Sequence, residues 1–203
     1  MNTNKSTLRF SGHDTFHCKE QWVLKGLQLI ENEEDILIFR KPEAISKLGV
    51  GKNMVRSIHY WLRAFGMLSD NEELTDIAKM LFIKGKWDKY LENDGSLWLL
   101  QYHLCKVQYA SMFKLIFNDY FSDKASLDFS EFQIKKFINR RLINNAQNNI
   151  ASKTLESDFK VFIRTYVSPT INNEKTIEDD FSVPLLSLNL VIDTKRTNDK
   201  NQK

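Results

Sequence analysis

Two histidines and an aspartate near the N-terminus are the residues whose types and spacing could carry out chemistry. His13 and His17 lie four positions apart, with Asp14 between them. On a helix, histidines at i and i+4 share a face and could bind zinc. His13 and Asp14 could instead act as a general base pair in phosphodiester cleavage, a reaction in which a divalent metal ion could take part. Gly12 disfavours a helix at His13 and no third ligand is obvious, so the sequence favours a histidine that hydrogen-bonds a turn, with no metal and no cofactor.

The stretch from Gly49 to Gly66 could bind phosphate groups. A glycine-containing turn precedes an expected helix whose one face is apolar and whose other face is basic. The spacing of the basic face is i, i+4, i+7 and i+11, given by Lys52, Arg56, His59 and Arg63. Such a helix could rest on a protein core and face a DNA backbone. The candidate DNA contacts here are Lys52, Asn53, Arg56 and Arg63. The alternative is an ordinary amphipathic helix with a solvated face.

The turn before this helix resembles a phosphate-binding loop only superficially. A Walker A motif needs glycine at the place of Ser46 and serine or threonine at the place of Asn53, and it follows a strand rather than a helix. We therefore exclude ATP binding. Backbone N–H groups at a helix N-terminus beside Lys52 would still suit one DNA phosphate.

A second stretch, from residue 153 to residue 166, repeats the same pattern. Its apolar positions have the spacing of the first helix, and its opposite face is again basic. The candidate DNA contacts on this face are Lys153, Lys160 and Arg164. This repetition is expected if the chain contains a second helix-turn-helix module, although two helices often share such a pattern.

The expected elements place both stretches in a mainly α fold with small β wings. A helix capped by Asp14 or Thr15 is expected first, and then a short helix, the glycine turn, the basic helix and a small hairpin over residues 67–74. This order is typical of a winged helix-turn-helix. We expect two such modules joined by a helical hairpin. The predicted division is 1–95 for the first module, 96–190 for the hairpin and second module, and 191–203 for a disordered tail.

The composition fits an intracellular helical protein. The 203 residues carry a net charge of +3, and only 7 glycines and 3 prolines are present, which favours helices over a loop-rich fold. Cys18 and Cys105 are far apart and suggest reduced thiols. No apolar run is long enough to span a bilayer, so we expect a cytoplasmic protein with no membrane partner.

An ordered string of motifs resembles a bacterial family of unknown function, family 4007. The resemblance covers roughly residues 8–190. It is carried by Phe10-Ser-Gly-His-Asp-Thr-Phe16, Lys47-Leu-Gly-Val-Gly-Lys-Asn-Met-Val55, Tyr60-Trp-Leu-Arg-Ala-Phe-Gly66, Leu74-Thr75, Leu97-Trp-Leu-Leu-Gln-Tyr-His-Leu104, Thr154-Leu-Glu-Ser-Asp158 and Arg164-Thr-Tyr166.

This resemblance implies DNA as a partner and a phage-defence or DNA phosphorothioation setting. Genes of the family typically lie beside those for an ATPase and a sulfurtransferase-like reductase, which are therefore expected partners. One branch resembles the B component of an Ssp-type system, which is described as a DNA nickase. Two departures stand out, because Asp14 replaces the family's usual glutamate and family members tend to continue beyond this chain.

Three functions follow as hypotheses. The first is binding of double-stranded DNA in a phosphorothioation or restriction system, and it is the one we favour for so short a chain. The second is a DNA-nicking component of that system, for which no catalytic residue is established beyond the guess of His13 and Asp14. The third is a winged-helix adaptor that binds other proteins of a DNA modification complex.

Overall fold

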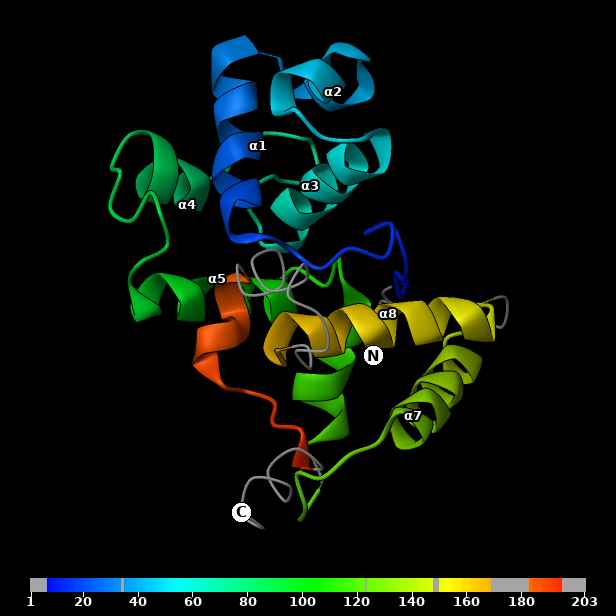
Figure 1. Ribbon diagram of the computed structural model, residues 1–203. Helices are drawn as coiled ribbons and strands as arrows, with labels where there is room; N and C mark the ends of the chain where they lie inside the picture. Colours follow the sequence, from blue (N-terminus) through cyan, green and yellow to red (C-terminus); the bar gives the residue numbers. More distant parts are fainter. Residues whose placement is uncertain (1–6, 34, 123, 148–149, 169–182, 195–203) are drawn as a thin grey trace, which may run out of the picture.

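Helices make up nearly all the regular structure of the computed structural model, which describes residues 7–33, 35–122, 124–147, 150–168 and 183–194 (Figure 1). The α-helices are α1 (Glu20–Glu33), α2 (Glu43–Leu48), α3 (Lys52–Ala64), α4 (Asp76–Ala78), α5 (Asp94–Lys106), α6 (Ser111–Lys114), α7 (Glu131–Asn144) and α8 (Ser152–Tyr166). Shorter helical stretches of other pitch are η1 (Ile36–Arg40), η2 (Lys79–Ile83), η3 (Leu115–Tyr120) and η5 (Pro184–Leu188).

The first group of helices packs around α1 and α3, at the top of Figure 1. A side-chain carbon added at Gly26 of α1 would lie 2.8 Å from Ile58 and 2.9 Å from Leu62, both on α3. The absence of a side chain at Gly26 is therefore what lets these two helices approach so closely. The short helices α2 and η1 pack against both of them, so α3 keeps only one side toward solvent.

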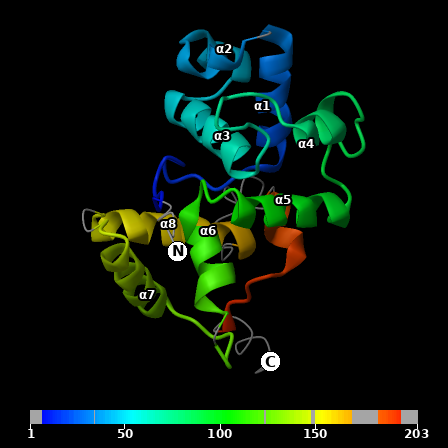
Figure 2. The ribbon, with the colours of Figure 1, turned by 180° about the vertical axis from the view of Figure 1, so that it is seen from behind.

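The second group is built on α8, which contacts α6, α7 and η5. The helix α6 continues as η3, and α7 packs on both η3 and α8. Seen from behind, α5 runs across the molecule and α6 runs down from its end (Figure 2). The predicted helical hairpin is therefore a corner between two helices, because Gln108 has a positive φ of 59° and turns the chain between them.

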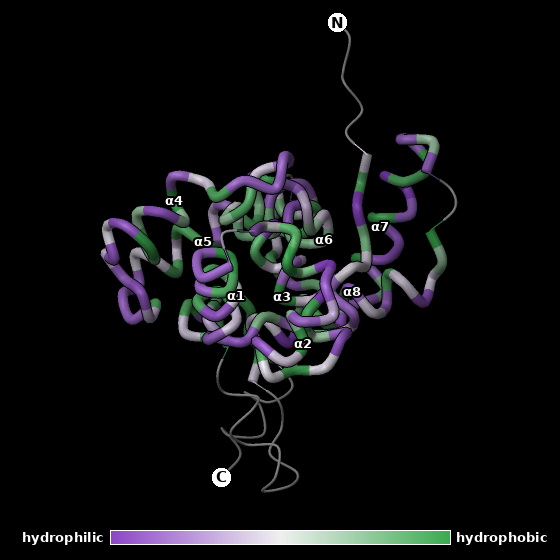
Figure 3. Tube along the Cα trace, turned by 90° about the horizontal axis from the view of Figure 1, so that it is seen from above, coloured by the Kyte–Doolittle hydropathy of each residue, from purple (hydrophilic) through white to green (hydrophobic). Residues whose placement is uncertain are grey.

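One hydrophobic core runs through both groups. Its bulky side chains include Trp61 of α3, whose ring lies 5.9 Å from that of Phe113 on α6, and Phe113 in turn contacts Phe162 of α8 at 5.5 Å. Apolar and polar residues alternate along the helices, as expected for helices with one buried face (Figure 3). The aromatic-rich composition is thus used to join the two groups.

The predicted β wings are not confirmed. Among the described residues there is one isolated antiparallel bridge, between Leu68 and Leu74, flanked by backbone hydrogen bonds from Ser69 to Glu73 and from Thr75 to Met67. Glu72 adopts a positive φ of 64° in the tight turn between them, and Thr75 at once caps α4 by accepting a hydrogen bond from the Ala78 N–H. The described part of the fold is therefore mainly helical, and the winged modules are not confirmed.

The first helix begins later than the sequence predicts. Asp14 and Thr15 have positive φ angles of 46° and 67°, which are incompatible with a helix start, and α1 begins at Glu20. The predicted tail falls mostly on residues 195–203, which lie outside the described part of the chain. Within the described ranges, no helix has the length and apolar character needed to cross a membrane.

Candidate nucleic-acid interface

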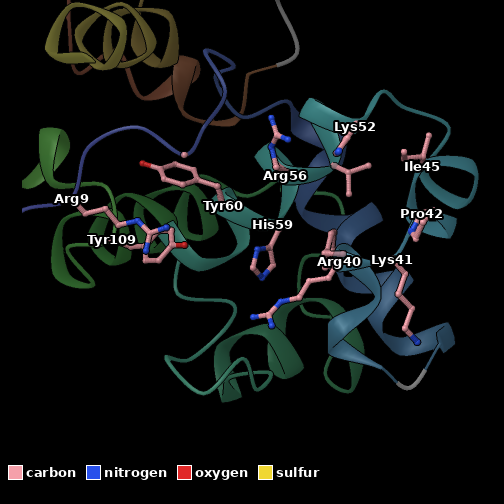
Figure 4. Close-up of a pocket in the computed structure, with 13 residues that line it drawn as sticks. Arg9, Arg40, Lys41, Pro42, Ile45, Lys52, Arg56, His59, Tyr60 and Tyr109 are labelled. Atoms are coloured by element: carbon pink, nitrogen blue, oxygen red, sulfur yellow. The ribbon is translucent and has the colours of Figure 1, made fainter. Parts of the chain in front are cut away.

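A basic cavity of about 530 Å³ lies beside α3 (Figure 4). Its lining comes from the segment before α1, from η1 and α2, from α3 and from the loop before α6. The lining residues are Arg9, Gly12, Phe39, Arg40, Lys41, Pro42, Ile45, Lys52, Val55, Arg56, His59, Tyr60 and Tyr109. This set contains five lysines and arginines and no carboxylate, so the cavity presents positive charge from several segments of the chain.

The local sequence explains why Lys52 and Arg56 face this cavity. Gly49 ends α2 with a left-handed φ of 67°, and Gly51 is the N-cap of α3. The apolar residues of α3 then turn inward, since Val55, Ile58 and Trp61 are buried. Lys52 and Arg56 are one turn apart on the remaining exposed side.

Two of the cavity cations have acidic partners. The Arg56 Nε donates to the Asp14 carboxylate at 2.7 Å, and a second Arg56 nitrogen donates to Asn53 at 2.9 Å. Lys41 donates to Asp35 at 2.6 Å, and this hydrogen bond holds the pKa of the Asp35 carboxyl below its ordinary value. These ion pairs hold the two cations in place, but each carboxylate offsets part of the positive charge that a ligand would meet.

Arg40 and Lys52 are different. Neither makes an ion pair or a side-chain hydrogen bond with any residue of the described chain. Figure 4 shows Arg40 and Lys52 on different sides of His59. An unpaired guanidinium and an unpaired ammonium at one cavity are suited to contact an anion.

Arg9, Tyr60 and Tyr109 form one wall of the cavity, at the end away from Pro42 and Ile45 (Figure 4). The Arg9 guanidinium lies 3.7 Å from the centre of the Tyr109 ring, and the Arg63 guanidinium lies 4.6 Å from the same centre. The Tyr60 ring contacts Tyr109 at 5.3 Å. Burial raises the pKa of both tyrosines, so both hydroxyls stay protonated and neutral near pH 7.

Arg63 lies behind this wall and is neutralised. It donates to Glu72 at 2.7 Å and to Asp70 at 3.0 Å, and its side chain is 15% exposed. The other Glu72 oxygen contacts His59 Nε2 at 2.7 Å. Burial raises the pKa of the Glu72 carboxyl, but the hydrogen bond with His59 and the charge of Arg63 outweigh it, so that the pKa lies below 4.5. Arg63 therefore supports the wall rather than offering a charge to a ligand.

The segment that carries Arg9 and Gly12 is held by Asp158 of α8. The buried Asp158 carboxylate accepts the Ser11 N–H at 3.0 and 3.1 Å and contacts His13 Nε2 at 3.0 Å. The other ring nitrogen of His13 accepts the Thr15 N–H at 3.1 Å, so the Nε2 proton is donated to Asp158. His13 is 2% exposed and both its nitrogens are engaged, so in this conformation it positions the segment. Catalytic roles for His13 and Asp14 remain predictions, and this geometry does not support them.

The metal hypothesis at His13 and His17 also stays without support. His17 is buried, as is Cys18 beside it, and burial raises the pKa of the Cys18 thiol so that it stays protonated. Within the described ranges, no group of three or more histidine, cysteine or acidic side chains is placed to hold a metal ion.

The basic stripe of α8 lies apart from the cavity. Lys153, Lys160 and Arg164 are exposed, and none of them lines it. At about 100° per residue they lie on the opposite side of α8 from Asp158, which faces the N-terminal segment. The two predicted stripes are therefore not brought together in one cavity.

The cavity therefore contains only some of the predicted DNA-contact residues, together with residues that were not predicted. Of the predicted contacts, Lys52 and Arg56 line the cavity, and Asn53 supports Arg56. Sequence reasoning missed Arg9, Arg40, Lys41, Tyr60 and Tyr109. A usable signal was the pair of basic residues before Pro42, immediately ahead of the predicted helix-turn-helix.

The chain belongs to the family described as Protein of unknown function (DUF4007), whose profile matches residues 10–202. The fold is also similar to two solved structures. One is described as an SspB crystal structure, with 24% identity and a TM-score of 0.70 over 91% of this chain and 56% of that chain. The other is described as magnesium ion-bound SspB, with 23% identity and a TM-score of 0.69 over 90% of this chain and 55% of that chain. This chain thus spans little more than half of each SspB chain. No curated protein matches it.

Proposed function

We propose that this protein binds double-stranded DNA through the cavity beside α3. The observation that carries the proposal is the convergence of five lysines and arginines, without a carboxylate in the lining, from three segments of the chain. Two of these cations, Arg40 and Lys52, lack any partner among the described residues. Phosphate contacts by such side chains supply much of the affinity of proteins for DNA.

The turn between α2 and α3 favours close approach of a backbone. A side-chain carbon added at Gly49 or at Gly51 would meet no atom within 4 Å, so the turn is open to a ligand. The first N–H groups of α3 lie at this turn beside Lys52, and a helix N-terminus favours an anion. In this arrangement α2 and α3 would approach the duplex as a helix-turn-helix pair, with α3 leading.

The setting of this activity is proposed from the relatives. The similarity in fold to SspB, together with the family match, supports a role as a DNA-binding component of a phosphorothioation or restriction system that protects a bacterium against phage. The ATPase and the reductase-like protein of such a system would be its partners in the cytoplasm.

A direct test measures, by fluorescence anisotropy at low salt, the affinity of wild type and of two double variants for a labelled duplex. We expect Arg40→Ala with Lys52→Ala to weaken binding by roughly 10- to 100-fold, since each hydrogen bond to a charged group contributes about 1.5–3 kcal/mol before solvent screening. Lys84→Ala with Lys86→Ala removes the same charge from an exposed loop outside the cavity and serves as the matched control. Equal weakening by both double variants would show a diffuse charge effect and reject the cavity.

DNA nicking is the second candidate, favoured by the similarity to a structure described as magnesium ion-bound SspB. Supercoiled plasmid incubated with this protein and Mg²⁺ would then yield an open-circular product. Because His13 is buried and engaged with Asp158, we expect no such product from His13 chemistry in this conformation. A nicked product that His13→Gln abolishes, in a variant with wild-type thermal stability, would establish the nuclease and a catalytic His13.

A further inference from the structure

A second basic cleft, of about 330 Å³, lies between η3 and α7 in the other group of helices. Lys124, Lys136, Arg140 and Arg141 line it together with the rings of Tyr120 and Phe137. The one carboxylate in the lining is Asp119. Neither the predicted DNA contacts nor the cavity beside α3 includes any of these residues.

The cations of this cleft have no acidic partners in the described chain. None of the four forms an ion pair with a described residue. Their neighbour Lys135, on the side of α7 toward α8, is by contrast paired with Glu156 at 2.7 Å. On α7, the paired Lys135 lies on one side, and the unpaired Lys136, Arg140 and Arg141 line the cleft. The positive charge of this helix is therefore concentrated on the side that faces the cleft.

Aromatic rings hold two of these cations in place. The Lys124 ammonium lies 4.8 Å from the centre of the Tyr120 ring, and the Arg141 guanidinium lies 5.2 Å from the centre of the Phe137 ring. The two rings pack edge to face at 5.3 Å and belong to different elements. Two of the four charges therefore lie against a packed pair of rings.

We infer that this cleft is a second binding site for a nucleic-acid phosphodiester backbone. Lys136 to Arg141 spans roughly 7.5 Å of helix at about 1.5 Å per residue, and one DNA strand carries one charge per about 3.4 Å of axis, so the cleft matches about two successive phosphates. Arg140 and Arg141 offer planar forks that fit phosphate oxygens. The inference rests on the proposed function for the kind of polymer bound, and the backbone belongs either to the duplex held at the first cavity or to a second molecule.

The test compares wild-type protein with Lys136→Ala plus Arg140→Ala. Both side chains are exposed on α7, and alanine is a good helix former, so the variant should fold. Lys84→Ala plus Lys86→Ala is the matched control, and thermal melting followed by circular dichroism checks all variants. Binding is measured on a duplex of about 30 base pairs over a salt series, and by stoichiometric titration with a hairpin duplex of about 10 base pairs, roughly 34 Å long.

If both sites hold one duplex, we expect the salt dependence on the long duplex to become shallower by about 1.8 units, because each phosphate contact contributes about 0.9. If the cleft holds a second molecule, the stoichiometry on the short hairpin falls from two to one instead. Either result supports the inference.

A variant that matches wild type in both measurements overturns the inference and leaves the cleft to an acidic protein partner. Loss of binding in this variant, with no change in Arg40→Ala plus Lys52→Ala, rejects the first cavity but keeps the cleft. If wild-type protein binds neither duplex, the cleft and the first cavity are both rejected as nucleic-acid sites.

Discussion

Asp158 is the buried charged residue that holds the middle of the N-terminal segment, beside the hydrogen bonds of Leu8 with Gln147 and of Arg9 with Ser111. Its carboxylate is buried and accepts hydrogen bonds from the Ser11 N–H and from His13. That segment brings Arg9 to the cavity wall and Asp14 to Arg56. Asp158 of α8 thus helps to connect the second group of helices to the basic cavity, together with Ser111 of α6, which hydrogen-bonds the Arg9 backbone.

Replacing Asp158 should therefore destabilise the protein and loosen the cavity. We expect Asp158→Ala to lower the free energy of unfolding by about 2–4 kcal/mol, because the buried His13 donor would lose its acceptor and the Ser11 N–H would lose its carboxylate partner. Urea denaturation measures this loss. Glu73→Ala, which removes an exposed carboxylate, is the control and should change stability by less than about 0.5 kcal/mol. Equal stability of both variants would contradict the anchoring role.

Glu72 makes a contribution that depends on pH. Its pKa is lower in the folded protein than its ordinary value of 4.5, so the stability it supplies is fully present above about pH 4.5 and is lost as pH falls through the folded pKa. We expect wild type to exceed Glu72→Gln in unfolding free energy at pH 7, and this advantage to shrink toward pH 3. Denaturation of both proteins across this range measures it. A difference that does not change with pH would show that His59 and Arg63 do not stabilise the charged carboxylate.

At the scale of elements, the contact between α1 and α3 fixes the position of the helix that carries Lys52 and Arg56. Gly26 has no positive φ, so the need for glycine comes from packing against Ile58 and Leu62. Gly26→Ala would gain about 0.5–1 kcal/mol of helix propensity but would force a side chain into this contact, for which we expect a cost of about 1–3 kcal/mol.

The net effect expected for Gly26→Ala is a modest loss of stability, measured by thermal or chemical unfolding. Gly49→Ala is an informative comparison, because that position has open space but a left-handed φ of 67°. Its cost of about 1 kcal/mol would come from the backbone alone. A stabilised Gly26→Ala variant would contradict the close approach of α1 and α3.

Sequence periodicity could predict α3 and α8 because each has an unbroken apolar face at helical spacing. It could not predict the start of α1, since the suitable capping residues Asp14 and Thr15 adopt left-handed backbone angles while His13 bonds to Asp158, more than a hundred positions away. The predicted wings are not confirmed, for a related reason. A hairpin pattern of apolar residues around an acidic turn does not reveal that the chain re-enters a helix after one bridge.

At the scale of the whole molecule, the cavity could be predicted only in part. Lys52 and Arg56 are visible from the sequence because they share one helix. Arg9 and Tyr109 come from segments a hundred positions apart, and only the tertiary fold places them together. Arg63 fits the basic stripe, but its ion pairs with Asp70 and Glu72 form through a turn whose shape the sequence does not specify.

The two groups of helices each carry a basic hollow, one beside α3 and one between η3 and α7. The modest net charge of +3 over 203 residues conceals this concentration. Charges gathered at such sites bind nucleic acid in a way that depends steeply on salt, whereas scattered surface charges do not define a site.

The most direct test of the account is therefore the slope of log affinity against log salt for a duplex, measured for wild type and for Arg40→Ala with Lys52→Ala. Two lost phosphate contacts predict a slope shallower by about 1.8 units, with Lys84→Ala plus Lys86→Ala parallel to wild type. Parallel lines for wild type and the cavity variant would contradict the claim that DNA phosphates bind beside α3.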